Sequence, residues 1–164
     1  MKLHTVGHSV ATLDDLVALL ASAGVELVAD VRSKPRSRLP HFDQVPLEEA
    51  LAGADIAYRF VGDKLGGMPR DPQIQARWRQ GHLDPLIVAH LRATDEWQDG
   101  LSELARLIER GRAVCLLCSE GDPNECHRKA VALDLVELIP GLELAHLAVG
   151  KTPAQDVGVQ EVLM

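Results

Sequence analysis

The chain has 164 residues, a length that suits one compact domain and leaves no room for a second of useful size. Hydrophobic residues make up 46% and charged residues 25%, which excludes a disordered chain, a collagen or a coiled coil as the overall description. Aromatic residues make up only 3%, so a surface that stacks nucleic-acid bases is not expected. The formal net charge of -7 disfavours nonspecific binding to nucleic acid or to an anionic membrane.

Positive charge is nevertheless concentrated in one segment. Residues 1–40 carry five Lys and Arg side chains against four Asp and Glu side chains. Four of these five bases lie between Arg32 and Arg38. An acidic protein therefore has one strongly basic stretch.

The amino terminus lacks the apolar stretch of a signal peptide, and no apolar run is long enough to span a membrane. We therefore expect a soluble, cytoplasmic protein with no membrane partner. The three cysteines, Cys115, Cys118 and Cys126, are an odd number and too close in sequence to form a disulfide framework. They are expected to be reduced thiols.

The first half of the chain alternates strands and helices. Apolar patterns and turn residues predict a strand over residues 3–6, a helix over 13–23, a strand over 25–31, a short helix over 47–52 and a strand over 56–61. Thr12 and Asp15 form a capping box at the start of the first helix, and Gly24 is placed to end it. The second strand leads into a loop over 32–46, where three prolines exclude a regular helix, namely Pro35, Pro40 and Pro46.

The second half continues the alternation. It predicts a helical stretch over 73–91 with a break near Gly81, a helix over 96–110, an uncharged strand over 113–118, a helix over 123–139 and a last strand over 142–149. Asp122 and Glu125 form a second capping box, with Pro123 at the first helical position. The pattern predicts a single layered α/β domain over residues 1–149, with a mostly parallel sheet of about five strands flanked by helices. Residues 150–164 are expected to be an irregular tail.

Polar motifs follow three of the predicted strands. They are Gly7-His8-Ser9, Asp30-Val31-Arg32-Ser33 and Cys118-Ser119-Glu120. Open α/β sheets bind ligands beyond the carboxyl ends of their strands, so these motifs are expected to meet in one site.

The basic stretch is suited to binding an anion. Arg32 and Arg38 offer guanidinium groups for a phosphate or carboxylate, and Ser37 offers a hydroxyl. Asp30 is expected to orient Arg32 or to act as a base. The alternative is an ordinary solvated basic loop.

The segment from Cys118 to Arg128 places thiols beside basic residues. Cys126 is predicted in the first turn of a helix, where the helix amino terminus, His127 and Arg128 would favour its thiolate. It would then serve as a nucleophile or redox thiol; the alternative is a small packing residue, the role predicted for Cys115.

The spacing of these cysteines differs from the usual pairs in zinc sites, so no metal is assigned. Cys118, Cys126, His127 and His8 could still meet in space around a metal ion. The spacing also differs from the Cys-x5-Arg loop of cysteine phosphatases, because Arg128 follows Cys118 by ten positions, so the sequence does not support that class.

Two further features lie near the expected site. Leu65-Gly66-Gly67 suggests either a close approach of the backbone to a ligand or, as the favoured interpretation, a turn with positive φ. His8 and His146 each lie near a predicted strand end on the side where the motifs gather.

Together the motifs resemble the domain of unknown function family 488 (DUF488), with a match over roughly residues 3–147. The motifs are Thr5-Val6-Gly7-His8-Ser9, Asp30 to Ser37, Leu65-Gly66-Gly67, Cys118-Ser119-Glu120 and Cys126-His127-Arg128. The resemblance implies a small α/β protein of a kind widespread in bacteria. It also implies a shared site made of His8, Ser9, Asp30, Arg32, Ser37, Cys118, Glu120, Cys126, His127 and Arg128.

These observations predict an enzyme that acts on or binds an anionic small molecule, phosphate-bearing and nucleotide-like. Glu120 and His127 are candidates for proton transfer, and Cys118 or Cys126 for the nucleophile. The alternative is a noncatalytic binding module that docks a nucleic-acid backbone or a partner protein through residues Arg32 to Arg38. The sequence indicates neither a cofactor nor an oligomeric state.

Overall fold

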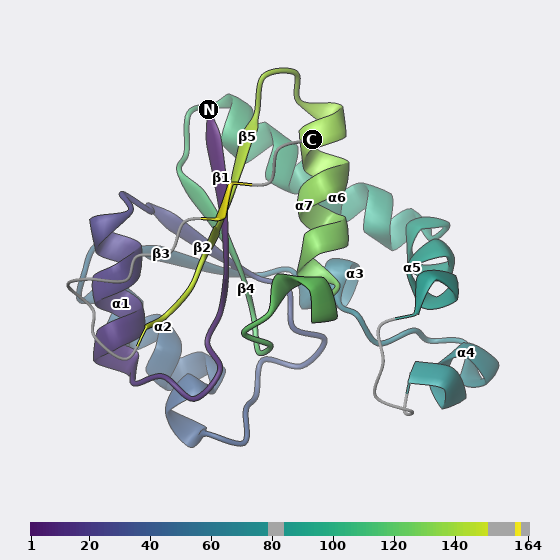
Figure 1. Cartoon of the computed structure of the whole chain (residues 1–164), viewed down its shortest axis with the longest axis horizontal. Coiled ribbons are helices and arrows are strands. Elements are labelled where there is room, and N and C mark those ends of the chain that lie inside the picture. The colour runs from purple at the N-terminus through teal and green to yellow at the C-terminus, as the bar shows by residue number, and fades with distance from the viewer. Residues whose placement is uncertain (79–83, 151–159, 162–164) are drawn as a thin grey trace.

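The computed structural model describes residues 1–78, 84–150 and 160–161 and contains one sheet flanked by helices on both faces (Figure 1). The strands are β1 (Lys2–Gly7), β2 (Leu27–Asp30), β3 (Ala57–Phe60), β4 (Val114–Cys118), β5 (Glu143–Leu147) and β6 (Gln160–Glu161). The α-helices are α1 (Leu13–Ser22), α2 (Gln44–Ala52), α3 (Gly62–Leu65), α4 (Pro72–Trp78), α5 (Pro85–Arg92), α6 (Asp95–Glu109) and α7 (Arg128–Leu138). Two 3-10 turns complete the described elements, η1 (Pro40–Phe42) and η2 (Pro123–Glu125).

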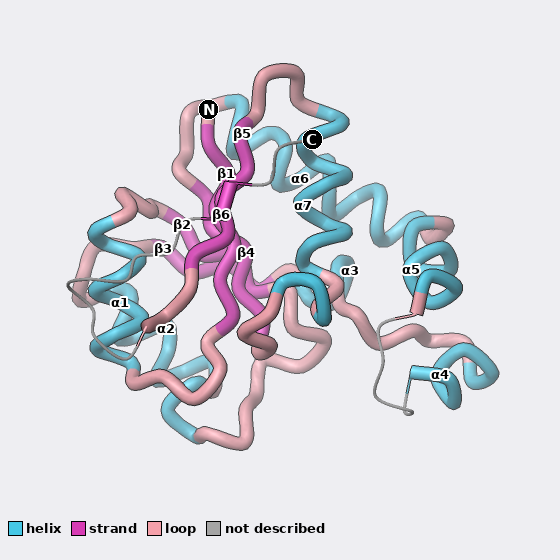
Figure 2. Tube along the Cα trace, viewed as in Figure 1, coloured by secondary structure: helices cyan, strands magenta, loops and turns pink. Residues whose placement is uncertain are grey.

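The strand order is β3-β2-β4-β1-β5-β6, and all neighbours are parallel except β5 and β6. Figure 2 shows the strands together at the centre of the domain with helices around them. The predicted α/β fold with a mostly parallel sheet of five main strands is therefore confirmed. The rest of the expected tail, residues 151–159 and 162–164, lies outside the described residues, as does the expected helix break near Gly81. None of the described helices combines the length and apolar composition that a membrane crossing needs.

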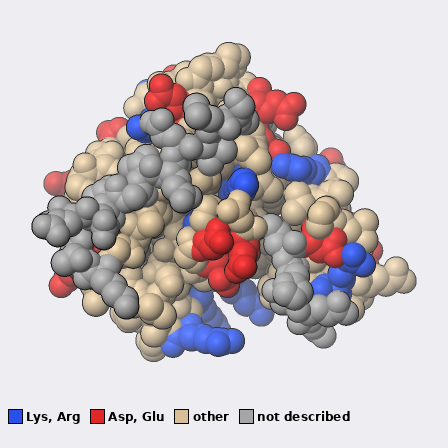
Figure 3. Space-filling view, viewed as in Figure 1, with Lys and Arg blue, Asp and Glu red and all other residues tan. Residues whose placement is uncertain are grey.

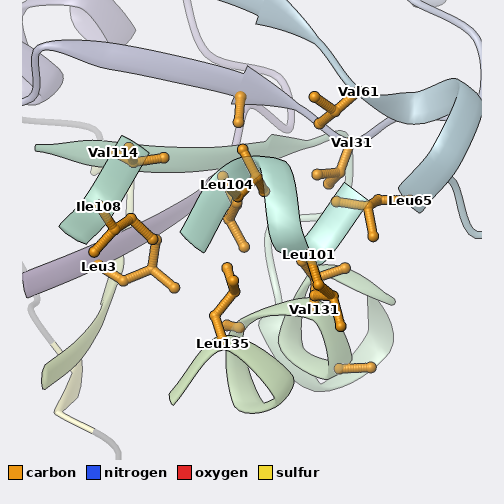
Figure 4. Packing of buried hydrophobic residues seen from close by; sticks show 14 of the residues in the cluster. Leu3, Val31, Val61, Leu65, Leu101, Leu104, Ile108, Val114, Val131 and Leu135 are labelled. Carbon is orange, nitrogen blue, oxygen red and sulfur yellow. The ribbon is translucent and has the colours of Figure 1, made fainter. Parts of the chain in front are cut away.

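Helices cover the two faces of the sheet with separate apolar clusters. On one face, α1 and α2 pack against the sheet through Leu16, Leu20, Leu47 and Leu51. On the other, α6 and α7 contribute side chains that Figure 4 shows packed beneath the strands, namely Leu101, Leu104, Ile108, Val131 and Leu135. Because successive side chains of a strand point to opposite faces, Cys115 belongs to the first cluster and Cys118 to the second.

Local signals place most of the elements correctly. Thr12 accepts a hydrogen bond from the Asp15 amide at the start of α1, as the capping box predicts. Gly24 follows this helix with a φ of 74°, a conformation that favours glycine. α2 begins at Gln44, although the prolines predict a loop through Pro46. Pro46 is tolerated because it lies in the first turn, where backbone N–H groups have no partner within the helix.

The prediction of one helix over 123–139 is wrong. Pro123–Glu125 form only the 3-10 turn η2, and α7 begins at Arg128. The Asp122 carboxylate caps η2 by accepting from the Asn124 amide. Cys126 lies between the two elements with an extended backbone, at φ -130° and ψ 138°, so it is not in the first turn of a helix.

Candidate functional site

The strand order opens a crevice at the carboxyl ends of β2 and β4. These neighbouring strands continue to opposite faces of the sheet, β2 into α2 and β4 into α7. Where the segments after two neighbouring strands separate in this way, they leave the crevice in which open α/β sheets bind ligands. It holds a cavity of about 770 Å³ lined by Arg32, Ser33, Lys34, Arg38, Gly67, Met68, Trp78, Cys118, Ser119, Glu120, Glu125, Cys126 and His127. In Figure 3, the lower edge of the molecule is hollowed between acidic and basic side chains.

Two thiols and an imidazole lie together in the cavity wall. The Sγ atoms of Cys118 and Cys126 and a ring nitrogen of His127 all lie within 4.8 Å of one another. His127 Nδ1 is 3.8 Å from Cys126 Sγ and 4.0 Å from Cys118 Sγ. The three side chains are buried, at 7%, 3% and 7% exposed for Cys118, Cys126 and His127. Any reagent must therefore reach them through the cavity.

The backbone fixes the orientation of the His127 ring. His127 Nε2 lies 2.8 Å from the carbonyl oxygen of Val31. A carbonyl oxygen only accepts, so Nε2 carries a proton and Nδ1 is left to exchange a proton with the sulfurs. A Cβ atom on Gly67 would lie 2.6 Å from His127 Nδ1, which explains the glycine there.

The Leu65-Gly66-Gly67 motif therefore serves close packing. Gly66 has a φ of -67°, and neither glycine is among those with positive φ, so the favoured interpretation of the motif is wrong. A Cβ atom on Gly66 would lie 2.5 Å from the Ser33 hydroxyl. Each glycine lets this segment approach a residue of the cavity wall.

The surroundings of Cys126 favour its thiolate. The Arg128 backbone N–H donates to Cys126 Sγ at 3.5 Å. The hydrogen bond between Cys126 and Cys118 lowers the pKa of Cys126 well below the usual range. Burial opposes this shift, whereas His127 and the charge of Arg128 lower the pKa further. The same hydrogen bond, with burial, raises the pKa of Cys118. Of the two thiols, Cys126 is therefore the one whose surroundings favour the thiolate.

The Arg128 side chain lies behind the cavity and braces its wall. The guanidinium is fully buried and donates to the carbonyl oxygens of Glu120 and Gly121, at 2.5 and 3.1 Å. Its Nε also donates to Thr5 Oγ1 at 3.2 Å, and Thr5 Oγ1 in turn is hydrogen-bonded to His146 Nδ1 at 2.5 Å. The network ties the loop after β4 to strands β1 and β5.

His146 gives the fold a pH dependence of defined sign. Burial, followed by the charge of Arg128, lowers the pKa of His146 from 6.5 to about 4. Between these values an unfolded chain binds a proton that the folded protein does not, so the free energy of unfolding falls as the pH is lowered. From pH 7 to pH 5 the wild type should lose about 1–2 kcal/mol more than His146→Gln in urea unfolding. Equal losses in the two proteins would contradict the assignment.

Asp30 and Arg32 form a buried ion pair. The carboxylate accepts from Arg32 Nε at 2.9 Å, from an Arg32 terminal nitrogen at 2.7 Å and from the Tyr58 hydroxyl at 2.6 Å. The other terminal nitrogen of Arg32 donates to the Phe42 carbonyl at 2.7 Å. Arg32 thus lines the cavity with most of its donors engaged, and Asp30 is occupied in holding it.

The remaining predicted residues divide between the cavity and its support. Arg38 and Glu120 line the cavity. Ser37 shapes the basic loop, since its hydroxyl accepts from the Leu39 amide. His8 stacks on Phe42 with ring centroids 4.2 Å apart, and its Nδ1 lies 2.9 Å from the Ser9 carbonyl oxygen. Neither His8 nor Ser9 is among the cavity's lining residues.

Several lining residues were not assigned to the site by the sequence. They are Ser33, Lys34, Gly67, Met68, Trp78, Ser119 and Glu125. Ser33, Lys34, Gly67 and Ser119 belong to motifs that the sequence singles out. Met68 and Trp78 carry no local signal, because the turn and helix α4 bring them to the cavity only in the folded chain.

Three donor atoms of the cluster suit a soft divalent cation. Thiolate and imidazole are the ligands that Zn²⁺ prefers, and a catalytic zinc site has three protein ligands and one open position. Cys118, Cys126 and His127 supply three, and the cavity side is open. His8 is not part of this group, contrary to the arrangement considered from the sequence.

Comparison with protein-family models gives a match to the Domain of unknown function DUF488 over residues 12–134. The chain belongs to the DUF488 family. The matched range covers β2, β4 and the Cys118–Arg128 segment, and therefore most of the cavity wall of this DUF488 protein. Comparisons with curated proteins and with solved structures gave no match.

Proposed function

We propose that this DUF488 protein is an enzyme that binds an anionic, phosphate-bearing and nucleotide-like small molecule and acts on it through a cysteine nucleophile. The observation that carries the proposal is the Cys126–His127 pair in the cavity wall, with 3.8 Å between Sγ and Nδ1. Nucleophilic cysteines are typically activated by an adjacent base that a third group orients. Here the Val31 carbonyl orients His127.

The chemistry assigns a role to each group. His127 Nδ1 takes the proton of Cys126, and the thiolate attacks the electrophilic atom of the substrate. The proton on Nδ1 then passes to the leaving group, with Glu120 as a second candidate for proton transfer because it lines the same cavity. The Arg128 amide stabilises the thiolate.

The anion is assigned to Lys34 and Arg38 rather than to Arg32 alone. Both are exposed and line the cavity. Within residues 1–78 and 84–150, neither forms an ion pair with a carboxylate. Arg36, which is also exposed in the same loop, does not line this cavity and offers a matched control.

Alkylation tests the nucleophile. In the native protein at pH 7, iodoacetamide should modify Cys126 faster than Cys115 and at least as fast as Cys118, because the thiolate is the reactive form. Single Cys→Ser variants and peptide mass spectrometry assign the reaction. Modification of Cys126 only after unfolding would make it a packing residue.

The same assay tests the anion. Phosphate or a nucleoside monophosphate should slow alkylation of Cys126 and raise the melting temperature, since binding to the native state stabilises it. Lys34→Gln and Arg38→Gln should weaken both effects, and Arg36→Gln should not. Binding of duplex nucleic acid with steep salt dependence, without protection of Cys126, would instead favour the noncatalytic module.

A further inference from the structure

Cys118 and Cys126 lie close enough for their sulfur atoms to be considered as partners in a disulfide bond. Their sulfur atoms lie within 4.8 Å of each other, and all three cysteines are free thiols. A disulfide bond is about 2 Å long, so the distance between the two sulfurs must shorten by at most about 3 Å for the bond to form. Both side chains line the same cavity, through which a small oxidant can reach them.

We propose that Cys118 and Cys126 form a reversible redox pair, which a hydroperoxide oxidises to an intramolecular disulfide. Cys126 is the thiol oxidised first, and Cys118 is the resolving thiol. The proposal shares Cys126 with the proposed function but does not depend on the anionic substrate.

The two cysteines are held differently, which suits these roles. Cys118 ends β4 in the centre of the sheet and pairs with Gly7 of β1. Cys126 lies in extended backbone between η2 and α7, outside either element. A change at Cys126 therefore need not break a helix or the sheet, and it can bring the second sulfur to the first.

The contacts of the two sulfurs also match the roles. Peroxide is attacked by a thiolate, and the Arg128 backbone N–H that donates to Cys126 Sγ at 3.5 Å stabilises that form. His127 Nδ1 lies 4.0 Å from Cys118 Sγ, where it is placed to accept the Cys118 proton in the second step.

The chemistry balances in two steps. Cys126 gives its proton to His127, and the thiolate attacks one peroxide oxygen. The O–O bond breaks and Cys126 becomes a sulfenic acid, while the leaving hydroxide, or alkoxide from an organic peroxide, takes the proton from His127. Cys118 then gives its proton to His127 and attacks the Cys126 sulfur. The S–O bond breaks and hydroxide leaves as water with that proton. With hydrogen peroxide, two thiols and one peroxide give one disulfide and two waters.

Cys115 provides an internal control. It is the same residue type and is completely buried, but it points to the α1 and α2 face of the sheet. Burial, only partly offset by the charge of Arg128, raises its pKa. It should therefore take no part in the reaction.

Intact-protein mass spectrometry after one equivalent of hydrogen peroxide tests the proposal. The wild type and Cys115→Ser should each lose about 2 Da, recovered with dithiothreitol, and peptide mapping should link Cys118 to Cys126. Cys118→Ser should instead gain about 16 Da as a sulfenic acid that dimedone traps. Cys126→Ser should remain unchanged under the same treatment.

Other outcomes would overturn the redox pair. Sulfinic acid at Cys126 in the wild type without a link to Cys118 would do so. So would one equivalent of bound Zn²⁺ that blocks both thiols until a chelator removes it. If iodoacetamide modifies Cys126 but peroxide forms no disulfide, this inference fails and the nucleophile stands. If the disulfide forms but phosphate never protects Cys126, the anionic substrate fails and the redox pair stands.

Discussion

Replacing Arg128 by Met is expected to lower the free energy of unfolding by about 3 kcal/mol, because a buried hub of three hydrogen bonds is lost. The guanidinium donates to the Glu120 and Gly121 carbonyls and to Thr5 Oγ1, and Met can replace none of these donors. Chemical denaturation with urea at pH 7 measures the loss.

Lys129→Met is the matched control for this variant. Lys129 is the next residue of α7, and its ammonium group donates to the exposed Asn124 side chain. Its replacement should change stability by only about 0.5 kcal/mol. Equal stability of the Arg128→Met and Lys129→Met proteins would show that water satisfies the loop carbonyls just as well.

The Arg128 variants also separate bracing from charge. Arg128→Lys keeps the positive charge near Cys126 but cannot reproduce the planar fork of donors. Its stability should fall, while alkylation of Cys126 by iodoacetamide at pH 7 should remain faster than in Arg128→Met. Equal alkylation rates in the two variants would remove the charge of Arg128 from the account of Cys126 reactivity.

Asp30→Asn is the second substitution with a large expected effect. Removing one partner of a buried ion pair leaves the other charge uncompensated, at a cost of about 3–5 kcal/mol. Arg32 is 3% exposed and Asp30 is fully buried, so solvent cannot compensate for the lost carboxylate. Urea unfolding should show a loss of this size.

The exposed pair Arg70–Glu96 supplies the comparison for Asp30→Asn. Its side chains are 74% and 48% exposed, so Glu96→Gln should cost less than about 1 kcal/mol. A loss that small for Asp30→Asn would mean that the Tyr58 hydroxyl and backbone carbonyls alone accommodate the Arg32 charge.

The two interactions stabilise opposite sides of the cavity. Arg128 fixes the loop that follows β4, and the Asp30–Arg32 pair fixes the segment that follows β2. Some motif residues thus hold the cavity wall in place, and others line the cavity. The exposed bases Lys34 and Arg38, together with Cys126 and His127, line the cavity itself.

The amino-acid sequence is enough to predict the order of the elements and the class of fold. Hydrophobic periodicity and capping residues act over a few positions, so β2, β4, α1 and α6 lie close to their predicted ranges. It also placed the polar motifs at strand ends, which a parallel sheet must bring to one edge. Cys118, Cys126, His127, Glu120, Arg32 and Arg38 line the resulting cavity.

The packing of the folded chain determines which motif residues face the cavity and which support it. Arg38 and Arg128 have the same side chain, yet the fold exposes one and buries the other. The His127–Val31 contact joins residues 96 positions apart, and Gly67 is needed only because that ring lies against it. Such contacts depend on strand order and packing, which local patterns do not encode. For the same reason the capping box at Asp122 could not reveal that Cys126 lies outside a helix, between η2 and α7.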